Sequence, residues 1–181
     1  MQYISHYDSP LGPVLLAADE IGLIGLWFEG QKYYGQQLDL KRGGSIEKEL
    51  PVFDMAKRWL DIYFSGREPE VAVPCHQVGT SFQQEVWQIL CEIPYGQTVT
   101  YGQIADRIAH RRGQKRMSAQ AVGGAVGRNP IALIIPCHRV VGSDGSMTGY
   151  AGGIDKKRML LQWEREKKIL LDETENGNVI L

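Results

Sequence analysis

Two capping-box patterns indicate where helices begin in the second half of this chain. Thr80-Ser81-Phe82-Gln83-Gln84 places either hydroxyl three residues before a glutamine, and Thr100-Tyr101-Gly102-Gln103 repeats the arrangement. In such a box the hydroxyl and the glutamine each satisfy a backbone N–H that the first helical turn leaves free. We therefore expect one helix from the first box to about Cys91 and a second from the other box to about Ala109.

A third helix is expected from Ser118 to Asn129-Pro130. Ser118 is a favourable N-cap, and Met117 and Val122 occupy the two positions of a hydrophobic staple. Because a polar turn joins this helix to the preceding one, the pair predicts a helix-turn-helix. Three glycines in the third helix cost about 1 kcal/mol each relative to alanine. Close approach to a partner or tight packing within the domain would compensate.

The first half of the chain predicts a small sheet followed by a helix. Apolar segments at 11–18 and 22–28 read as antiparallel strands split by a turn, and apolar residues recur at helical spacing over 51–64. The stretch 67–79 contains two prolines and reads as a connection. The expected fold is α+β, with a small α/β N-terminal domain at 1–70, a linker at 71–79, and a mostly helical domain with a winged helix-turn-helix at 80–181.

Charge is concentrated in the predicted helix-turn-helix. The net charge of the whole chain is only -1, so a nucleic-acid surface would have to be local. Between Tyr101 and Arg128 the only acid is Asp106. A solvated loop is the plain alternative, but the position between two helices favours phosphate contact. The six basic residues in this stretch are Arg107, Arg111, Arg112, Lys115, Arg116 and Arg128.

The chain has no apolar run long enough to span a membrane, and its N-terminus lacks the basic start of a secretory signal. We therefore expect a cytoplasmic protein. Its three cysteines are too few and too widely spaced for a disulfide framework. Cys75-His76 could supply half of a zinc site, but no second pair lies at ligand spacing, so we expect no metal.

Cys137 is the candidate nucleophile. It follows Ile131–Ile135, an apolar run of strand length, and stands beside His138 and Arg139 where that run ends. A neighbouring cation or histidine lowers the pKa of a thiol and makes it reactive. Cys91, on a helix, reads as an inert core residue.

The sequence Pro136-Cys137-His138-Arg139-Val140 resembles the active-site signature of the methylated-DNA-protein-cysteine methyltransferases. The resemblance covers about residues 80 to 170, and the first domain matches only loosely. It implies that O6-methylguanine is flipped from double-stranded DNA and that its alkyl group passes irreversibly to Cys137, without a cofactor and by a monomer. It leaves open whether O4-methylthymine is also accepted. The other matching segments are Thr100-Tyr101, Ala121–Ala125, Asn129-Pro130 and Gly149–Gly153.

Roles carried over from this family assign a catalytic group around Cys137. His138 would take the thiol proton through water, and Glu164 would orient His138. Asn129 would brace the turn, and Tyr101 would stabilise or protonate the leaving guanine. From its position alone, Glu164 could instead be a surface residue paired with Lys168 one helical turn later.

The same resemblance assigns the pocket and the DNA contacts. Gln120 stands where many members have an arginine that enters the base stack, and the turn from Ala109 to Met117 is longer than usual. The expected pocket residues are Val140, Tyr150, Ala151 and Gly152. The expected DNA contacts are Gln120, Ser118, Ala121, Arg111, Arg112, Lys115, Arg116 and Arg128.

Two other functions stay open from the residues alone. A lesion-binding protein of the alkyltransferase-like class would share the shape but lack the cysteine. A cysteine hydrolase could use Cys137, His138 and Glu164 with turnover, although it would not need a basic helix-turn-helix.

Overall fold

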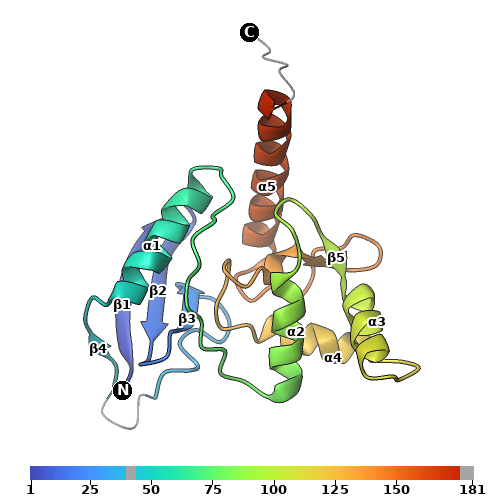
Figure 1. The fold of residues 1–181 in the computed structure, drawn as a ribbon, viewed down its shortest axis with the longest axis horizontal. Helices are drawn as coiled ribbons and strands as arrows, with labels where there is room; N and C mark the ends of the chain where they lie inside the picture. Colours follow the sequence, from blue (N-terminus) through green and yellow to red (C-terminus); the bar gives the residue numbers. More distant parts are fainter. Residues whose placement is uncertain (40–43, 176–181) are drawn as a thin grey trace.

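The N-terminal part of the computed structural model is a four-stranded sheet in the order β3-β2-β1-β4 (Figure 1). The structure describes residues 1–39 and 44–175, with side chains as far as 167. Strands β1 (Tyr3–Ser9), β2 (Gly12–Ala18) and β3 (Leu23–Phe28) are antiparallel neighbours, which confirms the two expected strands. The sequence pattern missed β1, which is rich in polar residues, and β4 (Ile46–Glu47), which pairs with β1 in parallel.

The helices begin where the capping patterns indicate. Helix α1 (Pro51–Phe64) lies across β1 and β2, and α2 (Ser81–Cys91) and α3 (Tyr101–Arg111) follow the two capping boxes. In the first box the Gln83 N–H donates to Thr80 Oγ1 at 3.2 Å, and the Thr80 N–H donates to Gln83 Oε1 at 3.0 Å. Helix α4 (Ala119–Gly127) starts at the Ser118 cap and ends two residues earlier than expected.

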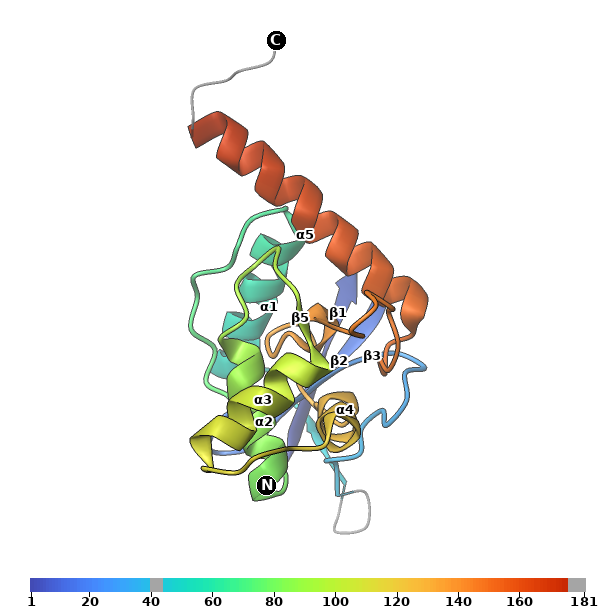
Figure 2. The same cartoon turned by 90° about the vertical axis from the view of Figure 1, so that its right-hand side faces the viewer.

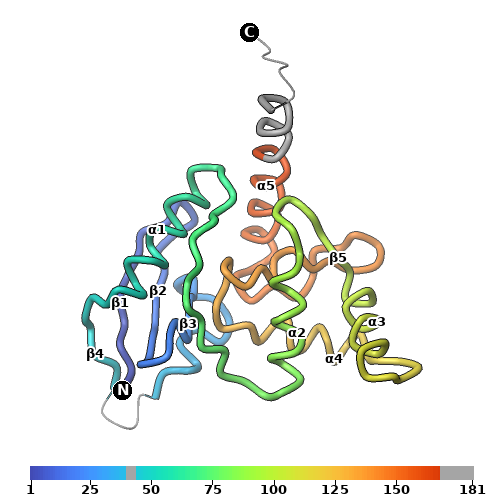
Figure 3. Tube along the Cα trace, viewed as in Figure 1, coloured from blue at the N-terminus to red at the C-terminus, as the bar shows by residue number. Residues whose placement is uncertain are grey.

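The outer edge of β3 joins the two halves of the molecule. The Leu23 N–H donates to the Pro74 carbonyl at 2.8 Å, so the connection between α1 and α2 pairs with this edge, as its path beside the sheet shows (Figure 3). Farther along the strand, the Leu26 N–H donates to the Pro130 carbonyl at 2.8 Å, and the Ala132 N–H donates to the Leu26 carbonyl at 3.1 Å. The segment that leads to Cys137 is therefore anchored on the N-terminal sheet.

The expected strand at Ile131–Ile135 is wrong. Only Ile131 forms a bridge with β3, and the chain then turns, with Leu133 at a φ of 67°. The reason is the Asn129 side chain, whose Oδ1 accepts from the Ile131 N–H at 3.0 Å and whose Nδ2 donates to the Ile135 carbonyl at 2.8 Å. These bonds curl the apolar run into a compact turn.

The C-terminal part also contains a short pair of parallel strands and ends in a long helix. Strand β5 (Val99–Thr100) pairs with β6 (Val140–Val141), and the 3-10 helix η1 (Cys137–Arg139) directly precedes β6. Helix α5 (Ile154–Glu175) crosses the molecule and projects beyond it (Figure 2). Among the described residues, no helix is long and apolar enough to cross a membrane.

Helix α4 contains glycines at positions where the protein's own packing would also accept a side chain. A Cβ built on Gly124 meets nothing within 4 Å, and one on Gly123 or Gly127 makes ordinary contacts of 3.7 Å. Tight packing within the domain therefore does not explain them. By contrast, a Cβ on Gly25 in β3 would stand 1.9 Å from the Trp27 ring.

We expect Gly124→Ala to stabilise the protein by about 0.5–1 kcal/mol, because alanine is the better helix former and has room here. Gly25→Ala should destabilise it by about 1–3 kcal/mol, because the added methyl overpacks the strand. Urea unfolding of both variants measures the two changes. Loss of stability in Gly124→Ala would show that α4 needs the glycine for its own packing.

Candidate active site

Cys137 stands at the start of η1, almost wholly buried at 6% exposure. Burial raises the pKa of its thiol, while the neighbouring Asn129 amide and the Lys157 ammonium act to lower it. The thiol is thus protonated at rest, and two polar groups are poised to favour its ionisation.

His138 is fully buried and bonded to Glu164, with 2.6 Å between His138 Nε2 and Glu164 Oε1. Burial lowers the pKa of His138 despite the opposing pull of Glu164, so the imidazole is neutral at neutral pH. Since an ionised carboxylate only accepts hydrogen bonds, Nε2 carries the proton and Nδ1 is left as an acceptor. Among the described residues, Nδ1 has no hydrogen-bond partner.

Glu164 is fully buried and accepts five hydrogen bonds, so it is not a surface residue. Besides His138, it accepts from the Tyr63 hydroxyl at 2.8 Å, from the Gly96 N–H at 3.1 Å, and from Arg139 Nε at 2.9 Å and Nη2 at 3.1 Å. Burial alone would raise the pKa of this carboxyl, but His138 and Arg139 together bring it to about 2. Glu164 is therefore a fixed negative charge in the interior. The Lys168 side chain, its alternative partner, lies outside the described residues.

Lys157 and Tyr101 meet at one carbonyl beside the cysteine. The Thr148 oxygen accepts from Tyr101 Oη at 2.8 Å and from Lys157 Nζ at 2.9 Å. Burial lowers the pKa of Lys157 to about 8 and, with the nearby Cys137, raises the pKa of Tyr101 to about 12. Gly149 follows with a φ of 78°, and a Cβ there would stand 3.0 Å from the Tyr101 hydroxyl, so the tight contact requires glycine.

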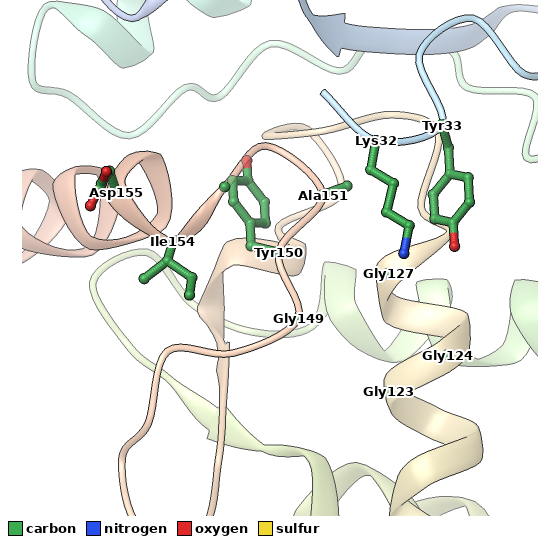
Figure 4. A pocket seen from close by; sticks show the side chains of 11 residues that line it. Lys32, Tyr33, Gly123, Gly124, Gly127, Gly149, Tyr150, Ala151, Ile154 and Asp155 are labelled. Carbon is green, nitrogen blue, oxygen red and sulfur yellow. The ribbon is translucent and has the colours of Figure 1, made fainter. Parts of the chain in front are cut away.

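A cavity of about 580 Å³ lies between the loop that carries Tyr150 and the glycine face of α4. Figure 4 shows Lys32 and Tyr33 reaching toward Gly127 from the N-terminal domain, with Ala151 to the left of Lys32. The Lys32 N–H donates to the Ala151 carbonyl at 3.1 Å, so the two loops are tied together. Of the expected pocket residues, Tyr150 and Ala151 line this cavity. Val140 is buried in β6, and Gly152 lies against the Tyr150 ring.

A second hollow of about 570 Å³ lies beside the first, between α3, α4 and the loop after β6. Gln120 is exposed and lines it, as do Tyr101 and Thr148. Ser118 and Ala121 are exposed on the same helix, so the expected DNA-contact residues of α4 share an open surface.

The basic residues of the helix-turn-helix divide into three groups. Arg107 and Arg111 pair with Glu92 at 3.4 Å and 3.0 Å, and Arg112 Nε donates to Glu85 at 3.0 Å, so all three turn toward α2. Arg128 lies 3.9 Å from the Tyr33 ring centroid and packs on the N-terminal loop. Lys115 and Arg116 are exposed, and no acid within the described ranges pairs with either. These two are the free cations of the turn.

Sequence reasoning missed several residues of this site. Lys157, Arg139 and Tyr63 approach the catalytic group from separate elements, and Lys32 and Tyr33 line the larger cavity. Lys157 stands one helical turn before the apolar Leu160 and Leu161, which was a weak signal that it is buried, and the motif itself contained Arg139. No local pattern marks Tyr63.

Comparisons with known proteins agree with this arrangement. Residues 2–76 match the model of the 6-O-methylguanine DNA methyltransferase ribonuclease-like domain, and residues 81–166 match the model of the DNA binding domain of the same family. A methylated-DNA–protein-cysteine methyltransferase of Methanosarcina barkeri is 45% identical over 90% of this chain and 96% of its own, and one of Haemophilus influenzae is 41% identical over 90% and 86%.

Solved structures show the same likeness. The Mycobacterium tuberculosis O6-methylguanine methyltransferase has a TM-score of 0.77 and 41% identity, covering 92% of this chain and 94% of its own. The M. tuberculosis protein in complex with DNA also has a TM-score of 0.77 and 41% identity, with 91% and 94% covered. Both domains, in their order, are thus shared over nearly the whole chain, and the chain belongs to the 6-O-methylguanine DNA methyltransferase family.

Proposed function

We propose that this protein repairs DNA by direct reversal, moving the alkyl group of an O6-alkylated guanine irreversibly onto Cys137. The observation that carries the proposal is the buried thiol of a family signature, flanked by a cation, an amide and a neutral histidine. We further propose that it acts once per molecule, as a monomer in the cytoplasm. O4-methylthymine is a second candidate substrate.

The chemistry is a direct displacement at carbon. The thiol proton passes to His138 Nδ1 through a bridging water, the sulfur bonds to the alkyl carbon, and the carbon–O6 bond breaks with its electron pair retained by guanine. Glu164 holds the imidazole and balances its charge, and Asn129 fixes the turn that presents the sulfur. The guanine anion then takes up a proton, so the products are a thioether and ordinary guanine.

Tyr101 and Lys157 support the charges that develop. A phenol with a pKa of about 12 keeps its proton, so Tyr101 suits hydrogen-bond donation to the leaving base better than complete proton transfer. Lys157 is cationic below pH about 8 and so favours the thiolate. The extruded base would enter the cavities beside Tyr150, Ala151 and Gly152, with Val140 behind the site.

The DNA face we propose is the exposed side of α4 with the preceding turn. Ser118 and Ala121 would lie against the backbone, and Gln120 would fill the gap left by the extruded base. Phosphate contacts would come from Arg111, Arg112, Lys115, Arg116 and Arg128.

Cys137→Ala should abolish methyl transfer while leaving DNA affinity within about twofold, because the thiol makes the bond and the basic surface supplies binding. Intact-mass measurement of the unaltered protein with O6-methylguanine DNA should show a gain of one methyl, mapped to Cys137. Many products per protein would indicate a hydrolase, and binding without transfer would indicate a lesion sensor.

Lys157→Met should slow single-turnover transfer at neutral pH by about tenfold for each unit by which the thiol pKa rises. In the unaltered protein the rate should also fall above pH about 8, where Lys157 loses its charge, and this descending limb should vanish in the variant. The matched control is Lys156→Met, since Lys156 lies over the Phe28 ring instead. Equal pH profiles for Lys157→Met and the unaltered protein would remove the lysine from the mechanism.

Lys115→Ala and Arg116→Ala should each reduce the magnitude of the salt slope of duplex binding by roughly 1, because each removes a free cation. Arg111→Ala and Arg112→Ala should have smaller effects, since those guanidinium groups pair with Glu92 and Glu85. Fluorescence anisotropy at several salt concentrations measures the slopes. If neither free-cation variant changes the slope, the turn is only a solvated surface.

A further inference from the structure

Tyr63 brings the N-terminal domain into contact with the catalytic group. It lies on α1, is fully buried, and donates its hydroxyl to Glu164 Oε1 at 2.8 Å across 101 residues of sequence. Its ring stacks on Trp59 at 5.3 Å between centroids and 8° between planes, and it meets His138 edge-on at 6.4 Å and 78°. Packing on two sides thus aims the hydroxyl at the carboxylate.

Tyr63 and His138 both donate a hydrogen bond to the same carboxylate oxygen, Oε1 of Glu164. Oε1 accepts from His138 Nε2, from the Tyr63 hydroxyl and from Arg139 Nη2, whereas Oε2 accepts from Arg139 Nε and the Gly96 N–H. Each donor withdraws negative charge from the oxygen that it contacts. The pull of Glu164 on the imidazole N–H is therefore set partly by the phenol.

We propose that Tyr63 is a positioning residue of the alkyl-transfer site, which holds the Glu164 carboxylate toward His138 and tempers its pull on the imidazole. The effect on transfer rests on the proposed function; the effect on the imidazole does not. Through this hydrogen bond the N-terminal domain influences the basicity of His138, although Tyr63 itself does not touch the substrate.

Other charged and polar groups also act on His138 and Glu164, and Tyr63→Phe leaves each of them in the chain. Lys157 and Arg139 act on His138 from α5 and η1, and Tyr95 and Tyr150 face Glu164 from two loops. Cys137 is the neighbour of His138 in η1. A change at Tyr63 alone therefore reports on one hydrogen bond among these charges.

Tyr95 provides a matched control. It is also buried at 5% exposure, and it meets the Tyr63 ring edge-on at 6.1 Å and 76°. Within the described residues, however, its hydroxyl has no hydrogen-bond partner. Tyr95→Phe removes an equally buried hydroxyl from the same aromatic cluster without removing a bond to Glu164.

The experiment compares Tyr63→Phe, Tyr95→Phe and the unaltered protein. Loss of the phenol should raise the pKa of His138, seen by NMR titration of the imidazole, by about 0.5–1 unit, because Oε1 regains charge. Single-turnover transfer in Tyr63→Phe should speed up by roughly three- to tenfold while His138 stays neutral at rest, because a more basic imidazole takes the thiol proton more readily. DNA affinity should be unchanged, and Tyr95→Phe should match the unaltered protein in all three measurements.

The outcomes separate the proposals. If the unaltered protein transfers no methyl but Tyr63→Phe still shifts the imidazole titration, the repair function fails and the positioning contact stands. An unshifted titration together with an unchanged rate, or equal effects from Tyr95→Phe, would reduce Tyr63 to a packing residue. Should Tyr63→Phe not fold, 3-fluorotyrosine at position 63 tests the same bond, because the more acidic phenol donates more strongly and should lower the pKa of His138.

Discussion

The buried carboxylate of Glu164 is the interaction on which the architecture of this site depends. Its donors come from α1, from the loop after α2 and from η1, so elements far apart in sequence must converge for the charge to be tolerated. An ionised group in the interior is costly unless it is paired and hydrogen-bonded, and removing one partner of such a pair typically costs about 3–5 kcal/mol. The convergence holds η1, and Cys137 with it, against the N-terminal domain.

The burial of Cys137 fits a nucleophile that we propose is used only once. A thiol whose pKa is raised by burial stays protonated and resists oxidation, so the molecule is not consumed before it meets a substrate. Groups that could ionise it are present, with Lys157 as a cation and, as an acceptor, Nδ1 of His138, which has no hydrogen-bond partner within the part of the chain that the structure describes. The site thus combines a protected resting state with an acceptor for the thiol proton.

Features fixed by interactions between residues close in sequence could be predicted, and features fixed by contacts between distant residues could not. The helix starts at Thr80 and Thr100 were predictable, because a capping box joins residues only three apart. The strand expected at Ile131–Ile135 was wrong, because hydrophobicity records burial but not the side-chain bonds of Asn129 that close a turn. The family motif led to Cys137. No sequence pattern pointed to Tyr63, because its partner Glu164 lies 101 residues away and such a contact leaves no periodicity in the sequence.

Helix α4 illustrates how a surface can be shaped for a partner that is not yet bound. Alanine would fit at Gly123, Gly124 and Gly127 without a clash, so the fold itself gives no reason to accept about 1 kcal/mol per glycine. If α4 is the DNA face, as we propose, the reason lies outside the chain: the bare glycines leave room beside the helix for the extruded base and the DNA backbone. Gln120 is the one long side chain on that helix, which is what insertion into a vacated base position would require. With Arg111 and Arg112 turned toward α2, steric fit at α4 would then contribute more to orientation on the duplex than charge at the helix itself.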